Sequence, residues 1–141
     1  MTIVVDSSVV LSWVMPDEDR RLTEDLLDSV ASTGAVIPPL FRIEVGNSLL
    51  MGARRKRIAF EYIPEALDLI GQLPLRIDTS SADHVWDSTV ELAAAYGLTL
   101  YDATYLESAI RLNMPLATLD ANLAHAARRA GVSSPWLQTP D

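Results

Sequence analysis

Four acidic residues are the main candidates for chemistry in this sequence of 141 residues: Asp6, Glu44, Asp102 and Asp120. Asp6 directly follows the apolar run of residues 3–5, and Asp120 directly follows residues 117–119. Each of these two carboxylates therefore stands where a short buried strand is predicted to end. Glu44 lies beside the apolar stripe of a predicted helix. Asp102 lies at the start of another helix, where the positive helix end favours its ionised form.

Carboxylates that share one site indicate a divalent cation. Like charges within a few ångströms raise one another's pKa unless a cation offsets them. Mg²⁺ binds carboxylate oxygens, keeps several waters and completes its shell with substrate phosphate. An ion held in this way can polarise a phosphodiester and activate water for its hydrolysis. Because the sequence has no cysteine and only two histidines, His84 and His125, oxygen ligands are favoured over sulfur or nitrogen.

The elements that must position these acids follow a regular alternation. Strands are predicted at residues 3–5, 35–37, 75–77 and 115–119. Helices are predicted at residues 7–13, 17–32, 40–57, 60–73, 81–96, 101–112 and 120–130. Alternation of short apolar strands with amphipathic helices is typical of βαβ units. It predicts an α/β fold with a mainly parallel sheet of about four to five strands, flanked by helices.

This architecture is expected to bring the acids to the same edge of the sheet. In open parallel sheets, ligands bind beyond the carboxyl ends of the strands, so Asp6 and Asp120 are expected at one edge of the sheet. Glu44 and Asp102 are expected to reach the same edge from their helices. The chain length suits one domain, residues 1–141, with no linker or repeat.

Composition limits the cellular location and the binding partners that we expect. The start MTIVVDSS has no basic leader region, and no apolar run approaches the roughly 20 residues of a spanning helix, so we expect no membrane and a cytoplasmic location. The net charge of −8 argues against a broad basic surface for nucleic acid, although a cation-binding carboxylate cluster also makes a chain acidic. The basic run Arg54 to Arg57 is interpreted as cations at a helix end. Trp13 and Trp86 are interpreted as core or interface residues.

Three blocks of sequence resemble the PIN-domain ribonucleases, and specifically the VapC-like toxins of bacterial toxin–antitoxin pairs. The blocks are VVDSSVVLSWV, PPLFRIEVGNSLL and LTLYDATYLESAIRLNMPLATLD, followed by ANLAHAARRAGV. They occur in the order and spacing of that family, and the resemblance covers nearly the whole chain. It implies a single PIN-like domain.

The resemblance also implies an activity, a cofactor and partners. It implies that Asp6, Glu44, Asp102 and Asp120 bind Mg²⁺ or Mn²⁺ and hydrolyse RNA with metal-activated water. Ser8, Asn47 and Thr118 match positions that line or support such a site. The family further implies a homodimer and an antitoxin partner whose tail covers the active cleft.

Other interpretations remain open from the residues alone. Asp6, Asp102 and Asp120 are each explained separately as helix caps, for which Asp is common. A non-catalytic PIN-fold module would use the same acids to dock a basic partner peptide. A phosphoacceptor receiver domain is disfavoured, because that chemistry wants a second acid beside Asp6 and a lysine after the last strand. This chain has Ser7 and Ser8 there and no lysine after Lys56.

Overall fold

A parallel sheet lies at the centre of the computed structural model, which describes residues 2–136. Its four strands are β1 (Val4–Val5), β2 (Ala35–Ile37), β3 (Leu75–Ile77) and β4 (Leu116–Ala117). They stand in the order β3-β2-β1-β4, and every pair is parallel. Val4 is opposite Val36 on one side and Leu116 on the other. The predicted α/β fold with a mainly parallel sheet is confirmed, and residues 1 and 137–141 of the predicted domain lie outside the described part.

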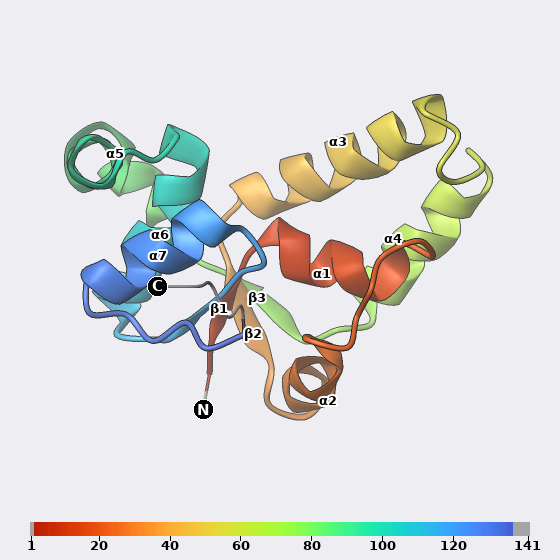
Figure 1. Ribbon diagram of the computed structural model, residues 1–141, viewed down its shortest axis with the longest axis horizontal. Coiled ribbons are helices and arrows are strands. Elements are labelled where there is room, and N and C mark those ends of the chain that lie inside the picture. Colours follow the sequence, from red (N-terminus) through yellow and green to blue (C-terminus); the bar gives the residue numbers. More distant parts are fainter. Residues whose placement is uncertain (1, 137–141) are drawn as a thin grey trace.

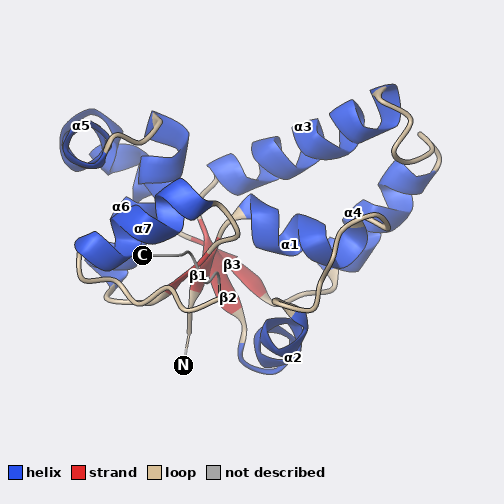
Figure 2. Ribbon diagram, viewed as in Figure 1, coloured by secondary structure: helices blue, strands red, loops and turns tan. Residues whose placement is uncertain are grey.

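Helices flank this sheet on both sides. They are α1 (Ser7–Val14), α2 (Glu24–Thr33), α3 (Leu40–Arg54), α4 (Tyr62–Gly71), α5 (Val90–Tyr96), α6 (Leu100–Leu112) and α7 (Ala121–Arg129). Figure 1 shows α6 and α7 on one side of the strands and α1, α2 and α4 on the other. Figure 2 shows α3 and α4 extending away from the strands, joined at their far ends by a loop.

Two predicted helices differ from the structure. The helix predicted at residues 17–32 begins only at Glu24, and turns precede it. The side chains of that segment make other contacts: Asp19 binds Arg21 within the segment, Asp17 binds Arg57, and buried Thr23 contacts Ser12. The helix predicted at residues 81–96 is divided into a 3₁₀ turn (Ser81–His84), a π turn (Val85–Thr89) and α5. In the first segment, contacts with Arg57 and Ser12 override local helix propensity.

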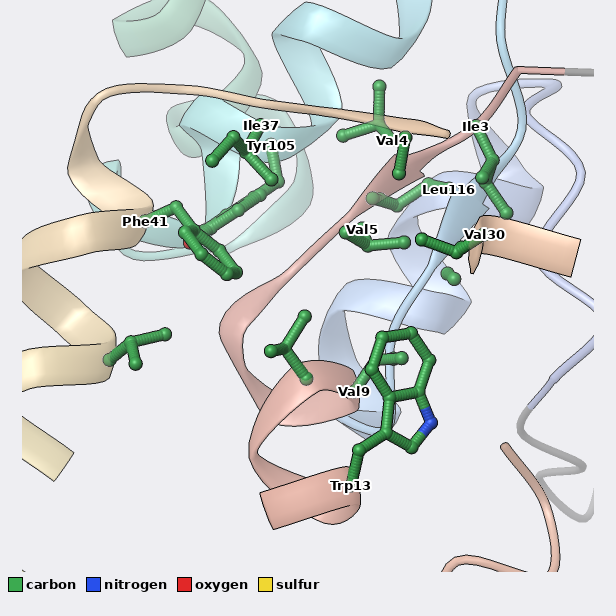
Figure 3. Close-up of a cluster of buried hydrophobic side chains, with 14 of the residues drawn as sticks. Ile3, Val4, Val5, Val9, Trp13, Val30, Ile37, Phe41, Tyr105 and Leu116 are labelled. Atoms are coloured by element: carbon green, nitrogen blue, oxygen red, sulfur yellow. The ribbon is translucent and has the colours of Figure 1, made fainter. Parts of the chain in front are cut away.

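The hydrophobic core lies between the strands and the helices. Figure 3 shows Val4, Val5 and Leu116 of the strands facing side chains from α1, α2, α3 and α6. Full burial of such a side chain is worth about 1.5–3 kcal/mol. Trp13 lies in this core as predicted and donates its ring N–H to the Thr23 carbonyl at 3.0 Å, whereas Trp86 is 93% exposed and is not a core residue. None of the described helices is long and apolar enough to span a membrane.

Candidate active site

Asp6 connects the segment that follows β1 with the segment that follows β4. It follows β1 and caps α1, since its Oδ1 accepts hydrogen bonds from the Val9 amide at 3.3 Å and the Ser8 hydroxyl at 2.5 Å. Its Oδ2 accepts a hydrogen bond from the Thr118 hydroxyl, just after β4, at 2.5 Å. The Leu119 amide in turn donates to the Ser8 hydroxyl at 3.0 Å. Ser8 and Thr118, which were predicted to support the site, thus both donate hydrogen bonds to Asp6.

Burial changes the acidity of Asp6. The residue is only 5% exposed, and loss of solvation raises its pKa to about 6. Hydrogen bonds from Ser8, Thr118 and the Val9 amide act in the opposite direction, and repulsion from Asp102 adds to the rise. A carboxyl with this pKa exchanges its proton readily near neutral pH, and a nearby cation would favour its ionised form.

Asp102 is the electrostatic centre of the four acids. It lies in the first turn of α6, where its amide donates to the capping Thr99 hydroxyl at 3.1 Å. Burial raises the pKa of Asp102, and repulsion from Asp120 and then from Glu44 raises it further. Asp120 caps α7 by accepting a hydrogen bond from the Leu123 amide at 2.9 Å. The capping interpretation is thus correct for Asp6 and Asp120, but it is incomplete because these acids also interact with Asp102.

Glu44 is held by a tyrosine that the sequence analysis did not select. The Tyr105 hydroxyl donates to Glu44 Oε1 at 2.5 Å, and Tyr105 itself is 1% exposed. Burial and then the Glu44 carboxylate raise the pKa of Tyr105, so the phenol remains protonated and donating. Its spacing from Asp102, three residues along one helix, was the available signal, since such residues share a face. Asn47 is exposed and makes no side-chain hydrogen bond in the described part of the chain.

These donors fit a hard divalent cation in their chemistry. Carboxylates and hydroxyls supply only oxygen, which Mg²⁺ and Mn²⁺ prefer. Within residues 2–136, however, no three His, Asp or Glu side chains stand in an arrangement ready to hold one metal ion. Each of Asp6, Glu44 and Asp120 commits an oxygen to a hydrogen bond within the protein. Ion binding would therefore require some carboxylates to turn toward one another.

A fifth acid at this edge of the sheet behaves differently. Asp78 directly follows β3, and its Oδ2 accepts hydrogen bonds from Arg111 and, at 2.8 Å, from Ser108. Burial acts to raise the pKa of Asp78, but the Arg111 and Ser108 contacts outweigh it and hold the pKa below its ordinary value. Arg111 also binds the buried Glu107 at 2.7 Å. Asp78 is therefore neutralised within the protein and is not a candidate metal ligand.

The sequence matches the family model described as PIN domain over residues 3–129. This chain belongs to the PIN domain family. A curated relative, Ribonuclease VapC3 of Pyrobaculum aerophilum, is 27% identical over 124 residues, which are 88% of this chain and 93% of the relative. The resemblance stated from the sequence blocks is thus confirmed at the level of the family.

Solved structures agree with the PIN fold. A crystal structure of PAE2754 from Pyrobaculum aerophilum has a TM-score of 0.68 and 21% identity, covering 95% of this PIN domain and 89% of that chain. A toxin–antitoxin complex from Klebsiella pneumoniae has a TM-score of 0.61 and 18% identity, covering 99% and 98%. At these identities the likeness shows the fold alone.

Proposed function

We propose that this PIN domain is a ribonuclease that depends on Mg²⁺ or Mn²⁺ and acts as the toxin of a toxin–antitoxin pair. One observation carries the proposal: the Thr118 hydroxyl links Asp6 and Asp120, since it donates to Asp6 Oδ2 at 2.5 Å and accepts from the Asp120 amide at 2.9 Å. Glu44 accepts a hydrogen bond from Tyr105, three residues along α6 from Asp102. The curated relative is named a ribonuclease, which supports RNA as the substrate.

In this proposal some side chains hold the metal ion and others orient the metal ligands. Asp6, Glu44, Asp102 and Asp120 would hold the ion, which when bound supplies positive charge to polarise the phosphodiester and the attacking water. Ser8 and Thr118 orient Asp6 by donating to its two oxygens, and Tyr105 orients Glu44. Supporting hydrogen bonds of this kind fix the direction of a metal ligand.

The proposed partners follow from the relatives. Two structural neighbours are described as a toxin–antitoxin complex and as FitAB bound to a DNA fragment. We propose that this chain likewise binds a cognate antitoxin and forms a homodimer. A toxin that acts on cellular RNA works in the cytoplasm.

RNA cleavage by purified protein tests the activity. We expect cleavage with Mg²⁺ or Mn²⁺ and none with chelator, and a loss of about 100-fold or more in Asp6→Asn and Asp102→Asn, because each removes a charge that holds the ion. Circular dichroism checks that both variants keep the fold. Asp28→Asn, which changes an exposed acid on α2, is the matched control and should cleave normally. Full activity in chelator would overturn the proposal.

A second candidate is a non-catalytic module whose acids dock a basic peptide. This alternative uses the same fold and the same acids, and it needs no ion between them. Metal titration discriminates between the two, since a docking module needs no Mg²⁺ or Mn²⁺ between Asp6 and Asp102. Peptide binding that is unchanged by metal, together with no RNA cleavage, would support docking.

A further inference from the structure

Positive charge gathers at the far end of α3 in a chain that is otherwise acidic. Residues 54–57 supply four of the 11 Lys and Arg residues, while the net charge is −8. The helix-end interpretation explains only the first of them, because α3 ends at Arg54 and only this residue lies in its last turn. Lys56 follows in the left-handed conformation at φ 63°, and all four side chains are exposed.

Three of these cations have no partner in the described part of the chain. Arg57 binds Asp17 at 2.8 Å and Glu18 at 3.4 Å, so its charge is offset. Within residues 2–136, no ion pair or side-chain hydrogen bond engages Arg54, Arg55 and Lys56, which we call the basic tip.

The surroundings of the basic tip suit a nucleic acid strand. A cavity of about 520 Å³ is lined by Arg54, Lys56 and Phe60, and Phe60 is 53% exposed. Glu61 also lines this cavity, beside Arg54, Lys56 and the ion-paired Arg57. Cations that neutralise phosphates, together with an exposed aromatic ring on which a base stacks, are the features of single-strand binding.

A hollow between α1 and α3, which we call the α1–α3 groove, lies between the neighbours of the acids and Arg57, and Arg57 also lines the cavity beside the basic tip. This groove of about 270 Å³ is lined at one end by Ser8 and Leu119, the neighbours of Asp6 and Asp120 in the site, and also by Arg57. Leu11, Met15 and Glu18 of the α1 side and Ser48 of α3 line the rest. Figure 1 shows α1 and α3 side by side, with α3 continuing to the loop before α4. From Glu44 to Arg54 the rise along α3 is roughly 15 Å.

We propose that the substrate RNA runs as a single strand from the acidic site along the α1–α3 groove, and that the basic tip binds its phosphates. This inference rests on the proposed ribonuclease function. Four acids repel a polyanion, so the strand needs an anchor away from them. The basic tip supplies three cations that are not paired with any described residue, and Phe60 supplies a stacking surface.

The salt dependence of RNA binding tests the anchor separately from cleavage. Fluorescence anisotropy of a labelled single-stranded RNA is measured with Asp6→Asn protein, which prevents cleavage. Substituting Arg54, Arg55 and Lys56 together by Gln should weaken binding about tenfold at low salt. It should also reduce the slope of log affinity against log salt by about 2, since each phosphate contact on a single strand contributes about 0.7.

A matched control separates contact from net charge. Arg21, Arg76 and Arg129 are exposed and lie on the loop before α2, on β3 and on α7. Substituting these three by Gln changes the net charge equally and should leave the slope unchanged. Phe60→Ala should weaken binding about tenfold without changing the slope, because stacking releases no counterions.

The outcomes distinguish this proposal from the proposed function. An unchanged slope in the triple variant of the basic tip overturns the anchor, whether or not the wild-type protein cleaves RNA. Absence of cleavage by the wild-type protein overturns the ribonuclease proposal and is measured independently. If a polyglutamate peptide binds the tip as tightly as RNA at the same ionic strength, the tip is a site for an acidic protein segment and the anchor proposal is wrong.

Discussion

At the scale of single residues, neighbours decide what a buried carboxylate does. Asp6 and Asp78 each follow a strand and are 5% and 8% exposed. Hydroxyl groups surround Asp6, and burial raises its pKa to about 6. Asp78 is buried as well, but Arg111 and Ser108 keep its pKa below the ordinary value. A bound cation would still stabilise the ionised form of Asp6, whereas the charge of Asp78 is already offset by Arg111.

The hydrogen bond between Tyr105 and Glu44 leads to a prediction about catalysis. Tyr105→Phe removes the donor to Glu44 but keeps the ring in the core. We expect kcat for RNA cleavage to fall about tenfold with little change in KM, because Glu44 keeps its charge and loses its orientation. Steady-state kinetics measures this, with Tyr101→Phe, at an exposed position, as the control. Lower stability with unchanged kcat would show a purely structural role.

The raised pKa of Asp6 leads to a prediction about stability in metal-free protein. Folding moves this pKa from 3.8 up to about 6, so the protonated form stabilises the fold. Its contribution is complete below pH 3.8 and is lost as the pH rises through about 6. Urea unfolding in chelator should show the wild type losing roughly 3 kcal/mol relative to Asp6→Asn across this range. Parallel pH profiles of the two proteins would contradict the raised pKa.

At the scale of elements, α6 connects the candidate site to the body of the fold. Its first turn carries Asp102 and its middle carries Tyr105. Further along, Glu107, Ser108 and Arg111 form a buried network with Asp78 at the end of β3. The position of Asp102 therefore depends on contacts that lie about one and a half to two and a half turns away on the same helix.

Breaking this network should destabilise the protein strongly. Arg111→Met leaves the buried carboxylates Asp78 and Glu107 without their cation, and such a loss typically costs about 3–5 kcal/mol. Urea unfolding at neutral pH measures the change. The deficit should shrink at acid pH, because Asp78, whose pKa is lowered by pairing, contributes stability above pH 3.8 that is lost as the pH falls. Arg21→Met, which breaks an exposed pair, should have little effect.

At the scale of the whole molecule, the site exists only when the chain has closed on itself. The Thr118 hydroxyl and the Asp6 carboxylate are 112 positions apart in the sequence, and the β1–β4 pairing brings them together. Metal binding should therefore be coupled to global folding.

This coupling predicts that the ion stabilises the folded protein. At a free Mg²⁺ or Mn²⁺ concentration of about 100 times Kd, the free energy of unfolding should rise by about 2.7 kcal/mol. Thermal unfolding with and without the ion measures the shift, and chelator should reverse it. Asp102→Asn should lose the shift, while Asp28→Asn should keep it. An equal shift in wild type and Asp102→Asn would place the ion elsewhere.

Local patterns in the sequence determined much of the architecture and the candidate acids. The apolar runs at residues 3–5, 35–37 and 75–77 have few alternatives to buried strands, and acids that follow strands of a parallel sheet share one edge. Local reasoning failed at residues 17–23, where Asp17 and Thr23 bind Arg57 and Ser12 in other segments. It also failed at residues 81–89, which form a 3₁₀ turn and a π turn in place of an α-helix. Propensity is a weak guide when tertiary contacts compete with it.

Only the tertiary structure decided the strand order β3-β2-β1-β4, the contact between Tyr105 and Glu44, and the different acidities of Asp6 and Asp78. These properties depend on residues far apart in the chain. A carboxylate's pKa is set by burial and by the charges within a few ångströms of it, and sequence spacing specifies neither. The sequence therefore determined which groups were available, and folding determined which of them meet.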